Sequence, residues 1–222
     1  MSTPSPKLQL FGHFASLART LGNEHRLELL ELLAQSPQSV EVLATRTGLA
    51  FANVSQHLQH LKKAGLIVGH REGKNVRYSL RDGPIIEAIT AIQNLAEHNM
   101  AEVKSVIHGY FHRLDDMEAI DMAELMKRLD SESVTLLDVR PEDEYRAGHL
   151  PNAVNITVEE LESRLSELPP GQQIVAYCRG PYCILSFKAV QSLRQRGFNV
   201  RRLVDGFPEW KAAGFPIETA AV

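Results

Sequence analysis

The stretch Gln173-Ile-Val-Ala-Tyr-Cys-Arg-Gly-Pro-Tyr-Cys-Ile-Leu-Ser-Phe-Lys188 contains a strand pattern, a turn pattern and a helix pattern in direct succession. Ile174 to Tyr177 is an apolar, β-rich run that predicts a buried strand. Arg179-Gly180-Pro181 predicts a turn, and the apolar residues that recur at helical spacing from Ile184 onward predict an amphipathic helix. This order indicates a strand–loop–helix unit, with Cys178 at the point where the strand ends.

The chain has 2 cysteines, Cys178 and Cys183, and they open and close this loop. A cysteine between a strand end and a helix start faces backbone N–H groups and the positive end of the helix, which favour a thiolate and a bound anion. We therefore predict that Cys178 is a nucleophile with a lower pKa than Cys183. Two alternatives stay open: Cys178 is a buried strand-end residue without chemistry, or Cys183 serves only as a small apolar side chain.

The loop Cys178-Arg-Gly-Pro-Tyr-Cys183 resembles the active-site loop of the rhodanese sulfurtransferases, in which the first cysteine carries a sulfane sulfur as a persulfide. The resemblance implies that Cys178 is catalytic. It also implies a set of substrate-binding residues: Arg179, Gly180, Tyr182 and Cys183. Two features depart from the family, because glycine stands third rather than fourth and Pro181 removes one N–H from the loop. The related dual-specificity phosphatases have a longer loop that ends in arginine, and Ile184 at that position argues against phosphate monoesters.

Other segments of the second half also resemble a rhodanese domain. They are Asp138-Val-Arg140, Glu144, Gly148-His-Leu-Pro-Asn-Ala153, Asp205-Gly206 to Trp210, and Gly214-Phe-Pro216. With a helix over 121–129 and a strand over 134–139, they predict an α/β rhodanese-like domain over residues 118–219, with a mostly parallel sheet. We expect Arg140 and Glu144 to form a structural ion pair. His149 is expected to be part of a turn, with a general-base role as the weaker alternative.

The first half of the chain has a different charge and a different pattern. Residues 1–114 contain 12 Lys and Arg against 9 Asp and Glu, whereas residues 115–222 contain 12 against 18, so that only the first half is basic. Four helices are predicted, over 8–20, 24–33, 40–47 and 50–64. Gly48 ends the third, and a hairpin is predicted over 71–81 around Gly73-Lys74-Asn75. Helix-turn-helix followed by a basic hairpin is the pattern of a winged helix.

Three segments of this half resemble the ArsR/SmtB repressor family: Ala18-Arg-Thr-Leu-Gly-Asn-Glu-His-Arg-Leu27, Val54-Ser-Gln-His-Leu58 and Lys63-Ala-Gly-Leu66. The resemblance implies an α+β winged helix-turn-helix domain over residues 8–114 that binds double-stranded DNA at a palindromic operator. Ala50-Phe51 departs from the family, which places a capping Ser or Thr before the recognition helix.

In the predicted recognition helix, Val54, Leu58 and Leu61 face inward and the polar residues face outward. Asn and Gln on such a face are suited to adenine edges, and basic residues of the wing to phosphates. The expected DNA contacts are Asn53, Ser55, Gln56, Gln59, His60, Lys63, Arg71, Lys74 and Arg77. The alternative is a solvated polar face without a partner.

Pro84 to Leu114 predicts one long helix whose apolar stripe needs a partner helix, which indicates a homodimer. Many ArsR-type proteins bind metals, but this half of the chain has no cysteine. His108 and His112 could share a metal on one helix face and lack a third ligand. We therefore expect neither a metal nor a cofactor.

The sequence has no signal peptide and no apolar run long enough to span a membrane, which predicts a cytoplasmic protein without a membrane partner. Asp115-Asp116-Met117-Glu118 is the expected domain boundary. The hypothesis is a repressor that senses sulfane sulfur, from a small donor such as thiosulfate or polysulfide, through Cys178. The alternatives are a true sulfurtransferase whose first domain serves targeting or dimerisation, and an inert rhodanese module that binds a partner protein.

Overall fold

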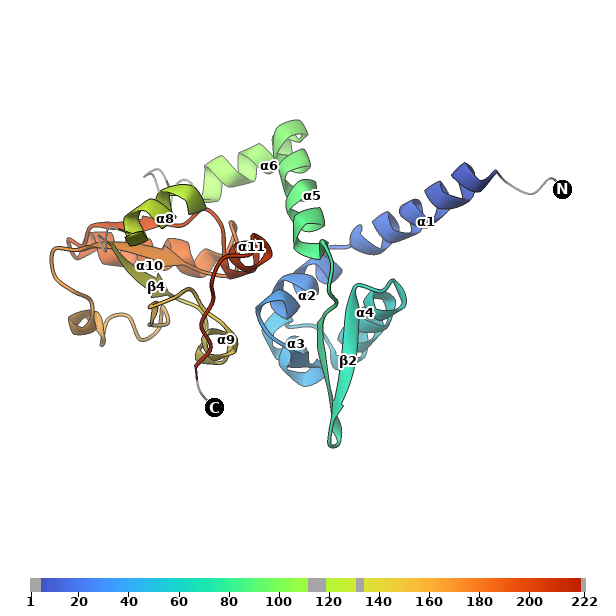
Figure 1. Ribbon diagram of the computed structural model, residues 1–222, viewed down its shortest axis with the longest axis horizontal. Coiled ribbons are helices and arrows are strands. Elements are labelled where there is room, and N and C mark those ends of the chain that lie inside the picture. The colour runs from blue at the N-terminus through green and yellow to red at the C-terminus, as the bar shows by residue number, and fades with distance from the viewer. Residues whose placement is uncertain (1–4, 112–118, 131–133, 221–222) are drawn as a thin grey trace. The chain divides into compact units, whose positions relative to one another are not determined.

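The computed structural model describes residues 5–111, 119–130 and 134–220 (Figure 1). Two compact units are present, Met1–Ile85 and Ile86–Val222. The expected boundary at 115–118 and the expected helix end at Leu114 lie outside the described residues, as does His112.

The first unit contains the four predicted helices. They are α1 (Pro6–Leu21), α2 (Glu24–Gln35), α3 (Val40–Thr47) and α4 (Phe51–Lys63). Asn23 caps α2, since its side chain accepts a hydrogen bond from the N–H of Arg26. Gly48 ends α3 in the left-handed conformation, at φ 70°, which glycine adopts without steric cost. Ala50 gives α4 no side-chain cap, as its sequence predicts.

Three antiparallel strands complete the first unit: β1 (Gln38–Ser39), β2 (Ile67–Glu72) and β3 (Asn75–Leu80), in the order β1-β3-β2. The hairpin turns at Gly73-Lys74 as predicted, and Gly73 has a φ of 62°. Its first strand starts earlier than expected, because Ile67 already pairs with Leu80. Helix-turn-helix and hairpin together form the winged helix that the sequence predicts.

The expectation of one long helix after the wing is wrong. The structure has α5 (Ile85–Asn99), then α6 (Ala101–Val106) and a π-helix, η1 (Ile107–Phe111). The interruption is at Met100, whose φ of −106° and ψ of 116° are extended. The Asn99 amide donates to the Leu95 carbonyl at 2.9 Å, and asparagine side chains compete in this way with helical backbone bonds.

The rest of the second unit is the predicted α/β fold. Its elements are α8 (Met122–Asp130), β4 (Val134–Asp138), α9 (Glu142–Ala147), β5 (Val154–Asn155), η2 (Leu165–Glu167), β6 (Gln173–Tyr177), α10 (Ile184–Gln195), β7 (Val200–Arg202) and α11 (Phe207–Ala212). The four strands pair in parallel, in the order β5-β4-β6-β7.

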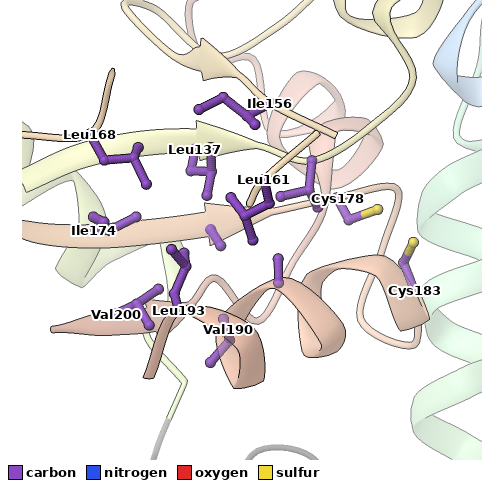
Figure 2. Packing of buried hydrophobic residues seen from close by; sticks show 13 residues of the cluster. Leu137, Ile156, Leu161, Leu168, Ile174, Cys178, Cys183, Val190, Leu193 and Val200 are labelled. Carbon is purple, nitrogen blue, oxygen red and sulfur yellow. The ribbon is translucent and has the colours of Figure 1, made fainter. Parts of the chain in front are cut away.

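Strand β6 is central, and its side chains supply two separate apolar clusters. Ile174, Ala176 and Cys178 belong to one cluster, which α10 covers (Figure 2). Val175 and Tyr177 belong to the other, together with Trp210 and other residues. Alternate residues of a strand point to opposite faces, so burial on both faces explains why this segment is apolar without interruption. The sheet therefore holds Cys178 rigidly at the end of β6.

Among the described helices, none is long and apolar enough to cross a membrane.

Candidate functional site

The two cysteines lie close together between β6 and α10. Cys178 follows the last residue of β6 and is 1% exposed, whereas Cys183 is the N-cap of α10 and is 9% exposed. Both are free thiols, and their sulfur atoms face each other across the loop (Figure 2). The fold thus brings the predicted pair together in a largely apolar environment.

The predicted order of their pKa values is wrong. A hydrogen bond from the Cys178 thiol lowers the pKa of Cys183 to about 7, and bonds from the N–H groups of Arg179 and Leu185 contribute against the effect of burial. Burial raises the pKa of Cys178 well above its usual value, and the neighbouring Cys183 adds to this. The Leu185 N–H at the helix start reaches Cys183, and this bond together with the one from the Cys178 thiol favours the negative charge on Cys183.

Arg179, a predicted substrate-binding residue, points into an ion pair. Its Nε lies 2.9 Å from Oε2 of Glu144 and its terminal nitrogen 2.7 Å from Oε1. The Glu144 side chain is fully buried. The sequence predicts an ion pair between Glu144 and Arg140, whereas the ion pair observed for Glu144 is with Arg179.

The loop backbone rests on the Asp205-Gly206 segment. The N–H of Phe207 donates to the carbonyl of Cys178 at 3.0 Å. A Cβ atom on Gly206 would lie 2.3 Å from the Gly180 nitrogen, so only glycine fits beneath the loop. The sequence marked this segment as rhodanese-like but did not show that it supports the cysteines.

Tyr182 connects the loop to the helices that precede the sheet in the second unit. Its hydroxyl donates to the carboxylate of Glu97 on α5. Its ring lies 5.8 Å from that of Phe111 in η1, which in turn lies 5.0 Å from Phe187 on α10. The guanidinium of Arg202 lies 4.2 Å from the Phe187 ring. Glu97 and Phe111 are distant in sequence, and nothing local to the loop signals this contact.

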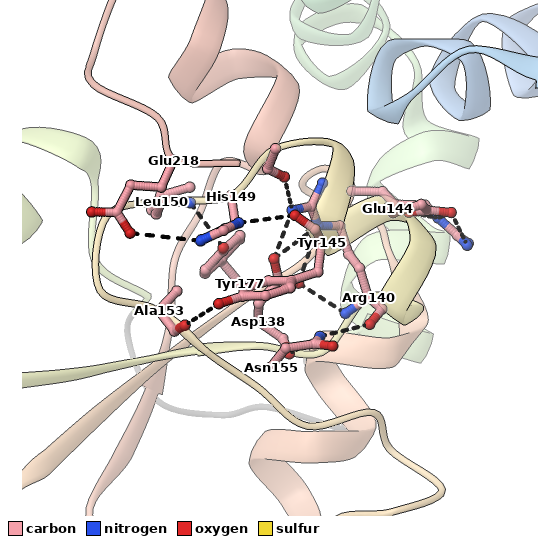
Figure 3. Close-up of polar contacts among 12 residues, drawn as sticks. Asp138, Arg140, Glu144, Tyr145, His149, Leu150, Ala153, Asn155, Tyr177 and Glu218 are labelled. Carbon is pink, nitrogen blue, oxygen red and sulfur yellow. Dashed lines mark hydrogen bonds and ion pairs between the residues drawn. The ribbon is translucent and has the colours of Figure 1, made fainter. Parts of the chain in front are cut away.

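A second polar network lies at the ends of β4 and β6 (Figure 3). Arg140 and Asp138 form a fully buried ion pair at 2.6 Å, and Arg140 also donates to the Gly148 carbonyl at 2.7 Å. His149 stacks on Tyr145 at 3.8 Å, and its Nδ1 lies 2.9 Å from the Tyr145 carbonyl oxygen. These contacts favour the expected turn role of His149. The sequence missed Asp138 as a partner of Arg140.

The residues expected to contact DNA are arranged largely as the helix periodicity predicts. Val54, Leu58 and Leu61 are fully buried, as expected. Five expected contacts on α4 are exposed: Asn53, Gln56, Gln59, His60 and Lys63; Ser55 is half-buried. On the wing Arg71 and Lys74 are exposed, but the exposed Arg77 donates to the Pro37 carbonyl at 2.5 Å. Arg77 therefore has a structural partner that the sequence did not suggest.

No three His, Cys, Asp or Glu side chains among residues 5–111, 119–130 and 134–220 lie close enough together to hold a metal ion. His112, which the sequence pairs with His108 as possible metal ligands, lies outside these residues.

The first unit is a winged helix that exposes amide and cationic side chains. The second unit has a parallel sheet and a loop with two cysteines. Together these are the features of a DNA-binding regulator with a rhodanese-like domain. Residues 23–68 match the family described as bacterial regulatory protein, arsR family, and residues 121–213 match the rhodanese-like domain. The chain is 40% identical over 215 residues to the HTH-type transcriptional regulator Rv0324 of Mycobacterium tuberculosis, covering 97% of this chain and 94% of the relative. The chain belongs to the arsR family of transcriptional regulators and carries a rhodanese-like domain.

Two further similarities each concern one part of the chain. A sulfurtransferase of Allochromatium vinosum is 35% identical over 100 residues, which are 44% of this chain and 92% of that protein. A homodimeric winged helix-turn-helix DNA-binding domain from Mycobacterium bovis is 30% identical, with a TM-score of 0.41, covering 46% of this chain and 94% of the other.

Proposed function

We propose that this transcriptional regulator is a repressor that releases its operator when the Cys178–Cys183 loop takes up sulfane sulfur. The observation that carries the proposal is the pair of thiols that face each other at the end of β6 (Figure 2). An ordinary sulfur carrier needs one thiol and must keep its persulfide until an acceptor arrives. A second, more acidic thiol in contact with the first suits a switch that converts the persulfide internally.

The proposed chemistry has two balanced steps. Cys178 attacks the outer sulfur of a donor R–S–SH, its proton passes by way of the Cys183 thiolate to the leaving R–S⁻, and Cys178–S–SH forms with release of R–SH. The Cys183 thiolate then attacks the Cys178 sulfur, which forms a disulfide and releases HS⁻. The sulfane sulfur is reduced to sulfide and the two thiols are oxidised.

The first unit supplies the DNA contacts in this proposal. Exposed amides of α4 read base edges, and the cations of α4 and of the wing bind phosphates. The proposed contacts are Asn53, Ser55, Gln56, Gln59, His60, Lys63, Arg71, Lys74 and Arg77. A regulator that binds bacterial chromosomal DNA works in the cytoplasm.

A homodimer on a palindromic operator completes the proposal. Helix α1 exposes Leu10, Phe11, Phe14 and Leu17, which recur at intervals of one helical turn or less. Such an apolar stripe gains stability by packing against a second helix, and two-fold symmetry would present two copies of α4 to two half-sites.

The contacts of Tyr182 offer a route from the cysteines to the DNA-binding part of the chain. Tyr182 lies inside the loop that a disulfide would contract, and it contacts Glu97 on α5 and Phe111 on η1. Helix α5 follows the wing strand β3 in the chain. A change at the loop therefore acts on the element that leads out of the winged helix.

The test is a gel-shift titration of the full-length protein on a fragment selected from random DNA, with and without polysulfide. We expect polysulfide to release the wild type, and dithiothreitol to restore binding. Cys178→Ser should stay bound, because the disulfide between the two cysteines cannot form. Release of the Cys178→Ser, Cys183→Ser double variant by the same polysulfide concentration would refute the proposal. Multiple turnovers of sulfur to cyanide without any effect on DNA would instead favour the sulfurtransferase alternative.

A further inference from the structure

We infer that the cysteine loop selects hydropersulfides and other sulfur donors of low charge, and discriminates against dianionic thiosulfate. The inference rests on the proposed function, since it assumes that the loop takes up sulfane sulfur. Three independent features of the loop carry it: the pairing of its cation, the use of its amides and the carboxylate placed beside it.

The cation of the loop is already neutralised. Both Arg179 nitrogens that face Glu144 donate to its carboxylate, and this carboxylate is fully buried. A dianion could recruit the guanidinium only by leaving a buried carboxylate without its partner, which is costly. Arg202, which also reaches the loop, donates to the carbonyls of Pro181 and Leu203 and lies over Phe187.

The backbone amides of the loop are also largely used. Pro181 has no N–H. The Cys183 N–H donates to the Gly180 carbonyl at 3.2 Å, and the Arg179 N–H donates to the sulfur of Cys183. The amides of Arg179 and Cys183 therefore already have partners within the loop. A cradle reduced in this way binds a dianion less well than a complete ring of N–H groups.

A negative charge stands next to the loop. The Glu97 carboxylate accepts the hydrogen bond of Tyr182, so it is held against the segment between the two cysteines. The cysteines themselves are packed with apolar residues such as Val139, Ile156 and Leu161, and transfer of a charged group into such surroundings is unfavourable. A donor with two negative charges is penalised by both effects, and a hydropersulfide, with at most one charge on its sulfur, is penalised less.

Sulfur transfer from a hydropersulfide and sulfur transfer from thiosulfate differ in the total negative charge that the loop must hold during the attack. Attack of a thiolate on R–S–SH gives the persulfide and R–S⁻, with one negative charge throughout. Attack on thiosulfate gives the persulfide anion and sulfite, so that three negative charges meet in one encounter. With Arg179 paired to Glu144, Arg202 bonded to carbonyl oxygens and Glu97 nearby, the loop stabilises the second arrangement poorly.

The experiment measures the rate of sulfur loading on the full-length protein by mass spectrometry, with cysteine hydropersulfide or with thiosulfate. Each loading rate is divided by the rate at which N-acetylcysteine takes sulfur from the same donor. This division removes the difference in intrinsic reactivity between the two donors. We expect the normalised rate to favour the hydropersulfide by about a hundredfold, because the additional charge must enter apolar surroundings. Equal normalised rates would overturn the inference, and absence of loading from either donor would refute the proposed function instead.

Two variants test whether the charge of Glu97 and the N–H missing at Pro181 cause the preference for the hydropersulfide. Glu97→Gln removes the carboxylate charge, and Pro181→Gly returns an N–H to the loop. Each should raise the thiosulfate rate several-fold more than the hydropersulfide rate. Glu87→Gln is the matched control, because Glu87 is an exposed residue of the same helix α5. If Glu97→Gln and Glu87→Gln change the two rates alike, the carboxylate beside the loop is not what selects the donor.

Discussion

The recognition helix α4 and the cysteine loop differ in how they present their functional groups. Helix α4 buries three aliphatic residues and exposes Gln56, Gln59 and Lys63 to solvent. The cysteine loop buries both of its sulfur atoms and supports them with residues from distant parts of the chain. A surface that reads DNA needs an accessible pattern, whereas a reactive thiol needs an environment that sets its charge.

This difference decides what a mutation should do in each region. Substitution of an exposed side chain on α4 removes one contact and leaves the helix in place. Substitution beneath the cysteine loop moves the backbone whose amides fix the thiolate. We therefore expect the largest effects at the loop and its supports, and smaller, more separable effects at the DNA face.

The largest effect is expected for Gly206→Ala. The new Cβ atom would lie 2.3 Å from the Gly180 nitrogen, and backbone must shift to accept it. Such overpacking should cost about 3 kcal/mol of stability and abolish sulfur loading on Cys178. Urea unfolding and mass spectrometry check the two effects. Gly12→Ala is the control, because nothing lies within 4 Å of its Cβ position, and it should leave loading intact.

A large effect is also expected on the pH dependence of alkylation. Because the pKa of Cys183 is lowered to about 7, its thiolate is present above that pH and lost below it. Iodoacetamide labelling of the wild type should therefore rise through pH 7. Cys183→Ser should label at least about tenfold more slowly at pH 8, because the pKa of the remaining Cys178 is raised by burial.

Cys178→Ser serves as the counterpart in this experiment. A serine hydroxyl can still donate to the Cys183 sulfur, so labelling should still rise near neutral pH. The opposite result, with fast labelling in Cys183→Ser and slow labelling in Cys178→Ser, would restore the order that the sequence alone predicted.

Smaller effects are expected at the DNA face. Lys74→Ala should weaken binding about tenfold on all sequences and reduce the salt dependence. Gln56→Ala should instead relax the preference at one base position, at a cost of about 1–3 kcal/mol. Arg77→Ala should weaken binding less than Lys74→Ala, because the Arg77 guanidinium is held by the Pro37 carbonyl. Fluorescence anisotropy at several salt concentrations distinguishes the three, and equal salt slopes for all would contradict this assignment.

The same contrast explains which features could be predicted from the sequence. The four helices of the first unit, the wing, the parallel sheet and the outward face of α4 follow from local patterns, and the structure confirms them. The pairing of Arg179 with Glu144 and the support from Gly206 depend on contacts between distant segments, and no local pattern reports these.

Two predictions failed for physical reasons that the structure shows. The pKa order was wrong because the sequence locates the loop but shows neither the burial of Cys178 nor its hydrogen bond to Cys183. The single long helix was wrong because Met100 adopts an extended conformation, in a segment without proline to mark the break.

The smallest effect is expected for Tyr182→Phe, which tests whether the two regions communicate through this residue. The variant loses the hydrogen bond to Glu97 and keeps the ring contact with Phe111. One such bond contributes about 1 kcal/mol, so the change in operator affinity on sulfur loading should shrink about fivefold. Affinities are compared at equal sulfur occupancy, measured by mass spectrometry, so that a change in loading does not enter. Tyr110→Phe is the matched control, since it removes an exposed hydroxyl of η1 next to Phe111. If both variants respond to sulfur as the wild type does, the hydrogen bond from Tyr182 to Glu97 does not carry the signal. The ring contacts of Phe111 with Tyr182 and Phe187 would then be the remaining connection to test, through Phe111→Ala.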